Sequence, residues 1–278
     1  MSSTPRAVLP GVELFAARTP TLPPATHTVS YALGTREVLL VEPATPYDDE
    51  RRAWLEWARG LGSTGRTAVA ILLTHHHPDH VGGATFFARE LGLPLWAHAA
   101  TEERLGAEVP IARRIEDGEV LSLEGPSSQR WRALHTPGHA PGHLCLHEEA
   151  LGALIVGDMV ASEGTILIEP IDGDMQLYLE QLRRLASLKA SVALPAHGAP
   201  IDEPRKLFDH YVAHRLAREA KVIAALRQEA VPTGELVPTV YADTNPALWP
   251  IATLSLEAHL IKLEREGKAR QTETGWAR

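Results

Sequence analysis

The sequence contains a single cysteine, Cys145, among 278 residues. One thiol cannot form a disulfide within the chain, and it excludes a zinc or iron–sulfur site built from several cysteines. Continuous apolar runs, such as residues 68–73, fall far short of the roughly 20 residues that span a bilayer. The first ten residues lack the charged start and apolar stretch of a signal peptide. We therefore expect no membrane association and, by default, a cytoplasmic location.

The chain also lacks an excess of basic residues. Its 27 Lys and Arg stand against 35 Asp and Glu, which gives a formal charge of −8. The whole imbalance lies in residues 1–200, because the later residues carry eleven of each sign. Phosphate contacts need clustered Lys and Arg. A general nucleic-acid-binding protein is therefore disfavoured, although the neutral C-terminal part still permits nucleic acid as a partner.

The composition is that of an ordinary globular protein, with 44% hydrophobic and 22% charged residues. At about 150 residues per domain, the length indicates one large or two smaller domains. Strand-like and helical patterns are mixed up to residue 202. The runs typical of strands are 8–15, 26–33, 37–42, 68–73, 95–98, 131–135, 144–147, 153–156 and 192–194. The amphipathic runs typical of helices are 48–60, 80–91 and 175–188. This order predicts two sheets flanked by helices.

After residue 202 the pattern becomes almost wholly helical. A long helical stretch is expected at 204–231, with further helices at 235–241 and 251–266. A strand-like tail follows at 268–278. This outline is typical of a winged-helix module, so we predict a catalytic domain at 1–202 and a winged-helix-like domain at 203–278.

Histidine is abundant, with 14 residues. Residues 74–80 read Thr-His-His-His-Pro-Asp-His and directly follow an apolar run that is typical of a buried strand. In this motif His75 and His77 can face one cation, while Asp79 and His80 turn toward a second position. Neutral imidazoles and carboxylates are natural ligands of zinc and iron. The motif therefore predicts a metal site.

Three more polar residues follow predicted strands. They are His139 in Thr-Pro-Gly-His, Asp158 in Gly-Asp and His197 in Pro-Ala-His-Gly. Glycine and proline give the backbone the tight turns that bring a ligand to a metal. Together with the His-rich motif, these residues predict one site built from loops at one edge of the sheets.

These motifs resemble those of the metallo-β-lactamase-fold hydrolase superfamily, and they span residues 74–198. The resemblance implies an α/β fold, a four-layer αβ/βα sandwich. It also implies two sets of metal ligands joined by one bridging carboxylate: His75, His77 and His139; Asp79, His80 and His197; and Asp158 as the bridge. Two divalent ions are expected as cofactors, zinc first, with iron or manganese as alternatives.

Some residues depart from the family pattern or have no assigned place in it. The antibiotic-degrading zinc enzymes of the family have Cys where this chain has Asp158, so a true β-lactamase is disfavoured. Many relatives have Asp-x-Gly where this chain has Glu42 followed by Pro-Ala. Glu42 is expected to support the metal loop in place of that Asp. His76 is expected to lie behind the ligands or face the substrate, and His143 either lines the pocket or makes a structural hydrogen bond.

The predicted reaction is hydrolysis. Two metal ions about 3.5–4 Å apart can supply hydroxide from water at neutral pH and polarise a carbonyl or phosphoryl oxygen. Asp79 and His80 are the expected catalytic residues, with Asp79 orienting the hydroxide as well as binding metal. No Ser or Cys nucleophile is required, and Cys145 is expected to be a small buried hydrophobe.

The region after residue 202 resembles the lactamase-beta-like subgroup, which includes a mitochondrial single-strand endoribonuclease and thioesterases acting on carrier-bound acyl chains. A small ester, thioester or lactone is the preferred substrate. An endoribonuclease is the alternative, and a nucleic-acid-binding module with vestigial hydrolase activity comes last. A nuclease needs a basic track, and the chain offers only scattered candidates: Arg215, Arg218, Lys221, Arg227 and Lys262. The sequence leaves open the oligomeric state and whether the C-terminal domain is a lid, a dimer element or a nucleic-acid contact.

Overall fold

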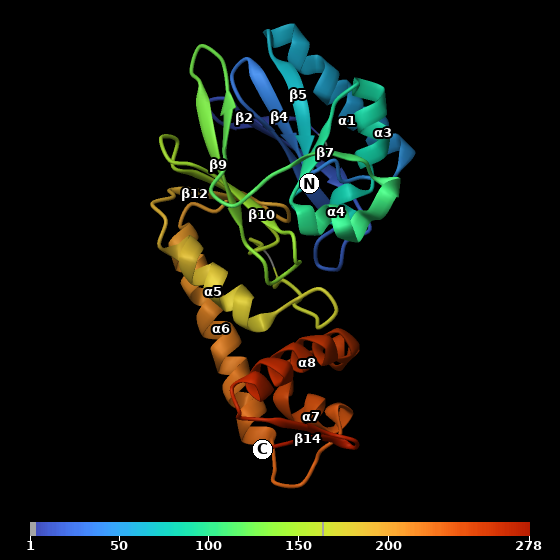
Figure 1. Ribbon diagram of the computed structural model, residues 1–278, viewed down its shortest axis with the longest axis vertical. Coiled ribbons are helices and arrows are strands. Elements are labelled where there is room, and N and C mark those ends of the chain that lie inside the picture. The colour runs from blue at the N-terminus through green and yellow to red at the C-terminus, as the bar shows by residue number, and fades with distance from the viewer. Residues whose placement is uncertain (1–3, 163) are drawn as a thin grey trace. The chain divides into compact units, whose positions relative to one another are not determined.

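The computed structural model describes residues 4–162 and 164–278. Figure 1 shows its helices and strands, which form two compact units. The first unit contains the described residues of Met1–Thr136, Pro141–Thr165 and Lys189–Pro204. The second contains Pro137–Ala140, Ile166–Leu188 and Arg205–Arg278. The loop Pro137–Ala140 thus belongs to the second unit, although the residues on both sides of it belong to the first.

In the described part of the first unit, seven strands form one sheet whose order follows the chain. They are β1 (Arg6–Leu9), β2 (Val12–Arg18), β3 (His27–Leu33), β4 (Glu37–Val41), β5 (Thr67–Leu72), β6 (Leu95–Ala97) and β7 (Ile111–Arg114). Strands β1 to β4 pair antiparallel, and β4 to β7 pair parallel. The buried residues of β4 and β5 explain their continuous apolar sequences, because a strand covered on both faces has no solvent side.

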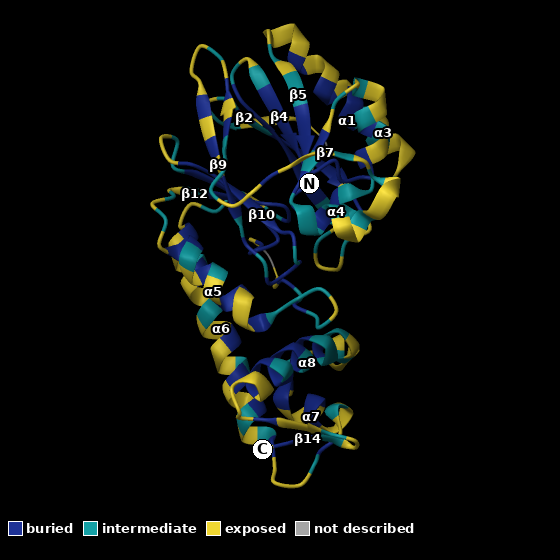
Figure 2. Ribbon diagram, in the orientation of Figure 1, coloured by how far each residue is buried: buried dark blue, intermediate teal, exposed yellow. Residues whose placement is uncertain are grey.

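The second sheet of this unit has the order β12-β11-β10-β9-β8 among the described strands. Their bounds are β8 (Val120–Leu123), β9 (Gln129–His135), β10 (Leu144–Glu148), β11 (Ala153–Gly157) and β12 (Val192–Pro195). Only β11 and β12 in this sheet pair parallel. One core joins the two sheets, with Leu39 and Leu72 from the first and Trp131, Leu146 and Ile155 from the second. Both sheets are largely buried (Figure 2).

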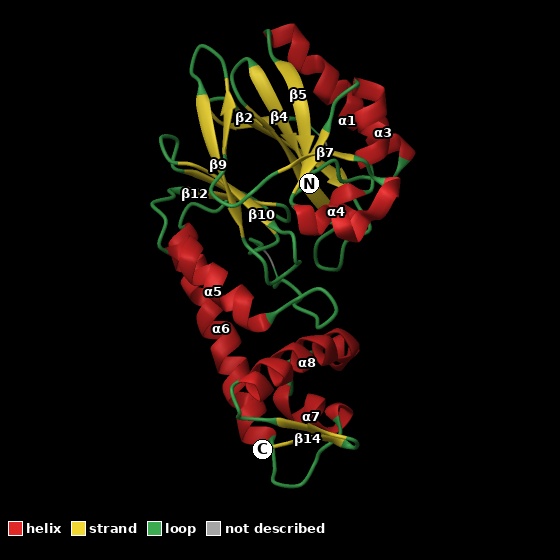
Figure 3. Ribbon diagram, viewed as in Figure 1, coloured by secondary structure: helices red, strands yellow, loops and turns green. Residues whose placement is uncertain are grey.

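Helices cover the outer face of the seven-stranded sheet (Figure 3). They are α1 (Asp48–Gly60), α2 (Pro78–Val81), α3 (Ala84–Leu91) and α4 (Ala99–Leu105). Trp54 from α1 and Phe87 from α3 stack with ring centroids 4.0 Å apart. Both rings belong to a second core with Val38, Leu40 and Ile71 of the sheet. The first unit therefore consists of a helical layer and two sheets, in agreement with the predicted mixture of strands and helices.

The second unit is mostly helical. Its elements are α5 (Met175–Ala186), α6 (Pro204–Ala225), α7 (Thr233–Val240), α8 (Trp249–Arg265), β13 (Arg270–Thr272) and β14 (Gly275–Ala277). Helices α7 and α8 share a core with the antiparallel β13–β14 ribbon through Val240, Leu256, Leu260 and Trp276. The predicted order of helix, helix and ribbon is confirmed, but α6 ends at Ala225 instead of continuing to residue 231.

Two predicted elements of the first unit were wrong in extent. Residues 8–15 are two strands and not one, because Gly11 adopts φ 70° and turns the chain between β1 and β2. Residues 80–91 are the separate helices α2 and α3. Gly83 precedes α3, and a Cβ at this position would lie 2.2 Å from the Phe87 ring. None of the helices in the described part of the chain has the length and apolar character needed to cross a bilayer.

Candidate metal centre

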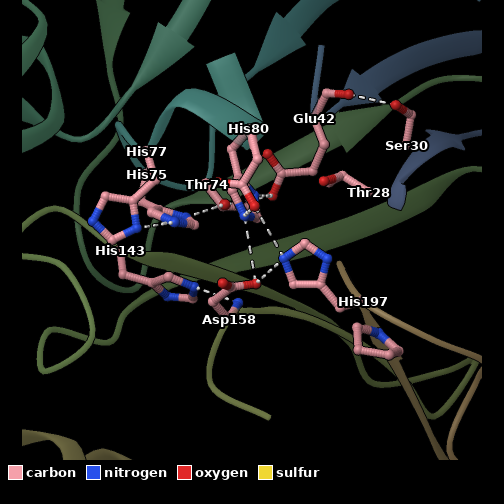
Figure 4. A network of polar contacts seen from close by, with 12 residues as sticks. Thr28, Ser30, Glu42, Thr74, His75, His77, His80, His143, Asp158 and His197 are labelled. Carbon is pink, nitrogen blue, oxygen red and sulfur yellow. Dashed lines mark hydrogen bonds and ion pairs between the residues drawn. The ribbon is translucent and has the colours of Figure 1, made fainter. Parts of the chain in front are cut away.

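The ends of three strands in the first unit bring the predicted ligands together. His75 and His77 lie on the loop after β5, and α2 carries Asp79 and His80. The neighbouring parallel strands β11 and β12 are followed by Asp158 and His197, respectively, so these two side chains emerge at the same sheet edge. Figure 4 shows the resulting cluster. The structure places six of the predicted ligands in it: His75, His77, Asp79, His80, Asp158 and His197.

Four of these residues form a compact acid–imidazole group. His197 Nε2 lies 3.4 Å from both Asp79 Oδ2 and Asp158 Oδ1. His80 Nε2 lies 3.5 Å from Asp158 Oδ1 and 3.8 Å from Asp79 Oδ2. Asp158 Oδ1 therefore faces both imidazoles at once. Atoms bound tetrahedrally to zinc at about 2.0–2.2 Å are separated by about 3.3–3.6 Å, close to these distances.

The other pair lies on the same loop. His75 Nε2 is 3.1 Å from His77 Nδ1, and the two rings are nearly perpendicular at 82°. The Nδ1 atom of His75 is 2.9 Å from Thr74 Oγ1, which itself donates to Glu42 Oε1. Because the Thr74 hydroxyl proton is directed at the carboxylate, the His75 ring donates from Nδ1 to Thr74. This leaves Nε2 unprotonated and suited to a metal.

His197 has the same arrangement, with a backbone partner. Its Nδ1 donates to the carbonyl oxygen of His27 at 3.0 Å, so its Nε2, which faces the carboxylates, is the unprotonated atom of the neutral ring. Such an outer hydrogen bond fixes the tautomer and orientation of metal-binding imidazoles. The sequence did not predict that Thr74 and the His27 carbonyl are hydrogen-bond partners of the ligands. The one signal was that Thr74 directly precedes the His-rich motif.

Glu42 lies behind the cluster and is buried, with 1% of its surface exposed. Its Oε1 is 3.2 Å from His80 Nδ1 and also accepts from Thr74. One carboxylate thus orients His80 directly and His75 through Thr74. Glu42 has φ 62°, a left-handed conformation that is costly for a residue with a Cβ. Its amide donates to Leu72 O, and its carbonyl accepts from Ser30, which hold the backbone in place.

The charges of the cluster suit divalent cations. Burial would lower the pKa of His197, but Asp158 and then Asp79 raise it to about 10. The pKa of His80 is likewise raised well above its usual range, because Asp158, Glu42 and Asp79 outweigh the effect of burial. Burial opposes ionisation of Asp79, yet His80 and His197 lower its pKa to about 2. The carboxylates therefore stay ionised and favour positive charge at this position.

The surroundings of one buried nitrogen atom also indicate that this cluster suits metal ions. The His80 ring is completely buried, and its Nε2 meets carboxylates of the described residues only at 3.5 and 3.8 Å, which is longer than a good hydrogen bond. A buried polar nitrogen normally has a partner, because an unsatisfied one is energetically costly. A cation between His80, His197 and the two carboxylates would satisfy it.

Zinc binding to the metal-free protein is expected to release about two protons per chain at pH 8. The raised pKa values mean that His80 and His197 are protonated at this pH, and both must become neutral to bind zinc. In the metal-free protein their ion pairs stabilise the fold fully below pH 6.5, and this stabilisation disappears as the pH rises toward 10. Isothermal titration calorimetry in buffers of different ionisation enthalpy measures the released protons. Release of no protons would contradict the assignment of these imidazoles.

Three further residues were predicted for the site or its surroundings. His139 is buried on the loop Pro137–Ala140, which belongs to the second unit, and its Nδ1 donates to Leu167 O at 3.0 Å. His76 is half-buried, with its ring 4.8 Å from that of His77. His143 is fully buried, and its ring lies 5.2 Å from that of His75.

Comparison with known families identifies the class of protein. The profile of the "Metallo-beta-lactamase superfamily" matches residues 23–197, and that of the "Beta-lactamase associated winged helix domain" matches residues 233–276. The chain belongs to the metallo-beta-lactamase superfamily and is a metal-dependent hydrolase. The predicted fold class is confirmed, including the winged-helix region.

Individual relatives agree with this membership. The chain is 31% identical over 215 residues to "Beta-lactamase-like protein 2 homolog" from Drosophila melanogaster, covering 73% of this chain and 71% of the relative. It is 31% identical over 202 residues to "Atrochrysone carboxyl ACP thioesterase" from Aspergillus fumigatus, covering 72% and 60%. The crystal structure of a metallo-beta-lactamase family protein from Thermus thermophilus superposes with a TM-score of 0.79 at 28% identity, covering 98% of this chain and all of that one.

Proposed function

We propose that this protein is a dinuclear metal-dependent hydrolase of a small ester, thioester or lactone, with an acyl thioester as the favoured substrate. The observation that carries the proposal is the presence of two neighbouring donor groups: Asp158 Oδ1 lies within 3.5 Å of the imidazoles of both His80 and His197, and His75 Nε2 lies 3.1 Å from His77 Nδ1. Each group offers imidazole or carboxylate donors to one cation, and the family motif supports Asp158 as the bridge between them. The thioester preference is supported by the similarity to a relative named as a thioesterase.

The residues proposed to hold the ions follow the family motif. They are His75, His77 and His139 for one ion; Asp79, His80 and His197 for the other; and Asp158 as the bridge. Imidazole and carboxylate donors favour zinc and also accept iron or manganese. His139 enters this set through its Thr-Pro-Gly-His motif, and its Nδ1 hydrogen bond to Leu167 directs the unprotonated Nε2 toward a ligand role.

The chain's own residues orient the reactants. When bound, two divalent ions lower the pKa of water toward neutrality and polarise the carbonyl oxygen of the substrate. Asp79 remains ionised because its pKa is lowered to about 2, so its carboxylate accepts a hydrogen bond from the attacking water and orients it. Glu42 holds the His80 ring in place behind it. No side-chain nucleophile is needed, and the thiol of Cys145 is buried away from solvent.

The basic residues of the second unit argue against an endoribonuclease. Arg218 and Lys221 both bind the carboxylate of Asp243 at 2.7 Å. Arg215 is buried, donates to the Ile166 carbonyl and lies 5.6 Å from the Tyr178 ring. These cations are occupied by partners within their own unit. They do not form the open basic track that a polynucleotide requires.

The two matched families, at residues 23–197 and 233–276, support separate roles for the two parts of the chain. Residues 1–202 are proposed to carry out hydrolysis, and residues 203–278 to form an accessory winged-helix-like domain for which nucleic acid is not the favoured partner. The cytoplasm remains the proposed location.

A substrate panel tests the proposed function. The zinc-loaded protein is assayed with an acyl thioester, the matching oxygen ester, a lactone and single-stranded RNA, each also after treatment with a chelator. We expect the thioester to be hydrolysed fastest and chelation to reduce its rate by about 10³-fold, because several kcal/mol of transition-state stabilisation disappear with the ions. Equal rates with and without metal would contradict the proposal. Preferential RNA cleavage would establish the nuclease instead.

A further inference from the structure

His143 lies beside the ends of strands from both sheets of the first unit. It directly precedes β10 and is completely buried. Its carbonyl oxygen accepts from the Thr136 amide at 2.8 Å, and the next amide, that of Leu144, donates to Thr74 O at 2.9 Å. The backbone of His143 is therefore held from both sides, which fixes the starting point of its side chain.

Both ring nitrogens of His143 make defined hydrogen bonds. The backbone N–H of Asp158 donates to Nε2 at 3.0 Å, so Nε2 carries no proton (Figure 4). A neutral imidazole then carries its proton on Nδ1. This atom is 2.8 Å from Thr136 Oγ1 and donates to it. Neither nitrogen can bind a metal or substrate without breaking one of these bonds.

Close packing supports the same orientation. Gly157 lies directly before Asp158 and has φ 46°, a conformation that favours glycine. A Cβ at Gly157 would lie 2.5 Å from His143 Nε2, so the ring is packed against this backbone. The network extends beyond Thr136, whose hydroxyl is 3.3 Å from Cys145 Sγ, while this thiol donates to Val156 O at 3.7 Å. The ring is thus braced from one side by Thr136 and from the other by the end of β11.

We propose that His143 is a positioning residue that holds the main chain of Asp158, the bridging carboxylate, through its Nε2. The inference rests on the proposed dinuclear site. Asp158 follows a glycine, and its backbone N–H donates to His143 Nε2 at 3.0 Å. The acceptor at Nε2 therefore keeps the carboxylate between His80 and His197. It also gives His143 a role outside the substrate pocket.

Two variants distinguish the effect of losing the hydrogen bond to Asp158 from the effect of losing the one to Thr136. In H143Q the side-chain oxygen can reach the position of Nε2 and accept from Asp158. In H143N the amide nitrogen can reach the position of Nδ1 and donate to Thr136, but the acceptor for Asp158 is lost. We expect H143N to weaken zinc binding by about 10–100-fold, as is typical when an outer partner of a ligand is removed. H143Q should remain close to wild type.

Zinc affinity is measured by competition with a chromophoric chelator, alongside the unfolding of each metal-free variant in urea. A purely structural role predicts that both variants lose stability and lose zinc affinity to the same extent. Equal zinc affinity for H143N and wild type would overturn the inference, as would equal losses in H143N and H143Q. If wild-type protein bound no zinc, the proposed function would fail instead.

Nitrogen-15 NMR of histidine-labelled wild-type protein tests the same geometry without any substitution. We expect His143 to show a protonated Nδ1 and an unprotonated Nε2 that accepts a hydrogen bond, both in zinc-loaded and in metal-free protein. The opposite tautomer would overturn the inference even if zinc binds normally.

Discussion

Replacing Asp158 with alanine is expected to reduce kcat/KM for acyl hydrolysis by about 10³-fold or more. The carboxylate faces His80 and His197 at 3.5 and 3.4 Å, so its loss leaves Asp79 as the carboxylate that faces both imidazoles. Both ions of the proposed site depend on Asp158. Metal analysis after gel filtration should show fewer than two zinc ions per chain in the variant, together with the loss of turnover.

Asp209→Ala is the matched control for Asp158→Ala. Asp209 is exposed on α6 and pairs with Arg205 at 3.8 Å, and this contact contributes little to stability at the surface. We expect this variant to retain wild-type zinc content and kcat/KM. If Asp158→Ala hydrolysed the substrate as fast as Asp209→Ala, the bridging role would be excluded.

Replacing Trp54 with alanine is expected to lower the free energy of unfolding by about 3–5 kcal/mol. Trp54 is fully buried, stacks on Phe87 with centroids 4.0 Å apart and meets Trp57 edge-on at 5.4 Å. Its indole N–H also donates to Ser30 Oγ at 2.8 Å, and Ser30 donates to the carbonyl of Glu42. The substitution therefore removes core packing and one support of the residue behind the metal ligands.

Trp54→Phe distinguishes these two contributions. It keeps an aromatic ring against Phe87 but removes the donor to Ser30, so a smaller part of the stability should be lost, about 0.5–1.5 kcal/mol for the hydrogen bond. Denaturant unfolding of the metal-free proteins gives both values. A loss below about 1 kcal/mol for Trp54→Ala would contradict the packing described for this core.

The sequence predicted the ligand residues of the site better than the residues that hold these ligands in place. Asp79 and His80 lie in one motif, and Asp158 and His197 each follow a short apolar strand with Gly or Pro beside them. Because strand ends gather at a sheet edge, such residues are expected to converge, and those of the first unit do. The order of these motifs along the chain is the feature that resembles the family.

The hydrogen bonds that hold the ligands in place join residues far apart in the chain. Thr74 binds Glu42, 32 positions earlier, and Asp158 binds His143, 15 positions earlier. No periodicity encodes such pairs, because each needs the register of two different strands. The positive φ of Glu42 is equally invisible, since this conformation is rare in residues other than glycine.

Some elements of the fold were missed for a different reason. Strand β7 reads Ile-Ala-Arg-Arg and is mostly exposed, so it lacks the apolar alternation that marks a strand. Helix α4 has seven residues, of which only Thr101 is buried. Pairing with β6 places β7 in the sheet, and this tertiary contact overrides the local pattern.

This chain is proposed to hold two divalent ions joined by Asp158. Anomalous diffraction at the zinc edge from crystals of the zinc-loaded protein measures this directly. We predict two peaks on either side of the Asp158 carboxylate, one beside His75 and His77 and the other between His80 and His197. A single peak, or zinc bound away from these residues, would contradict the claim.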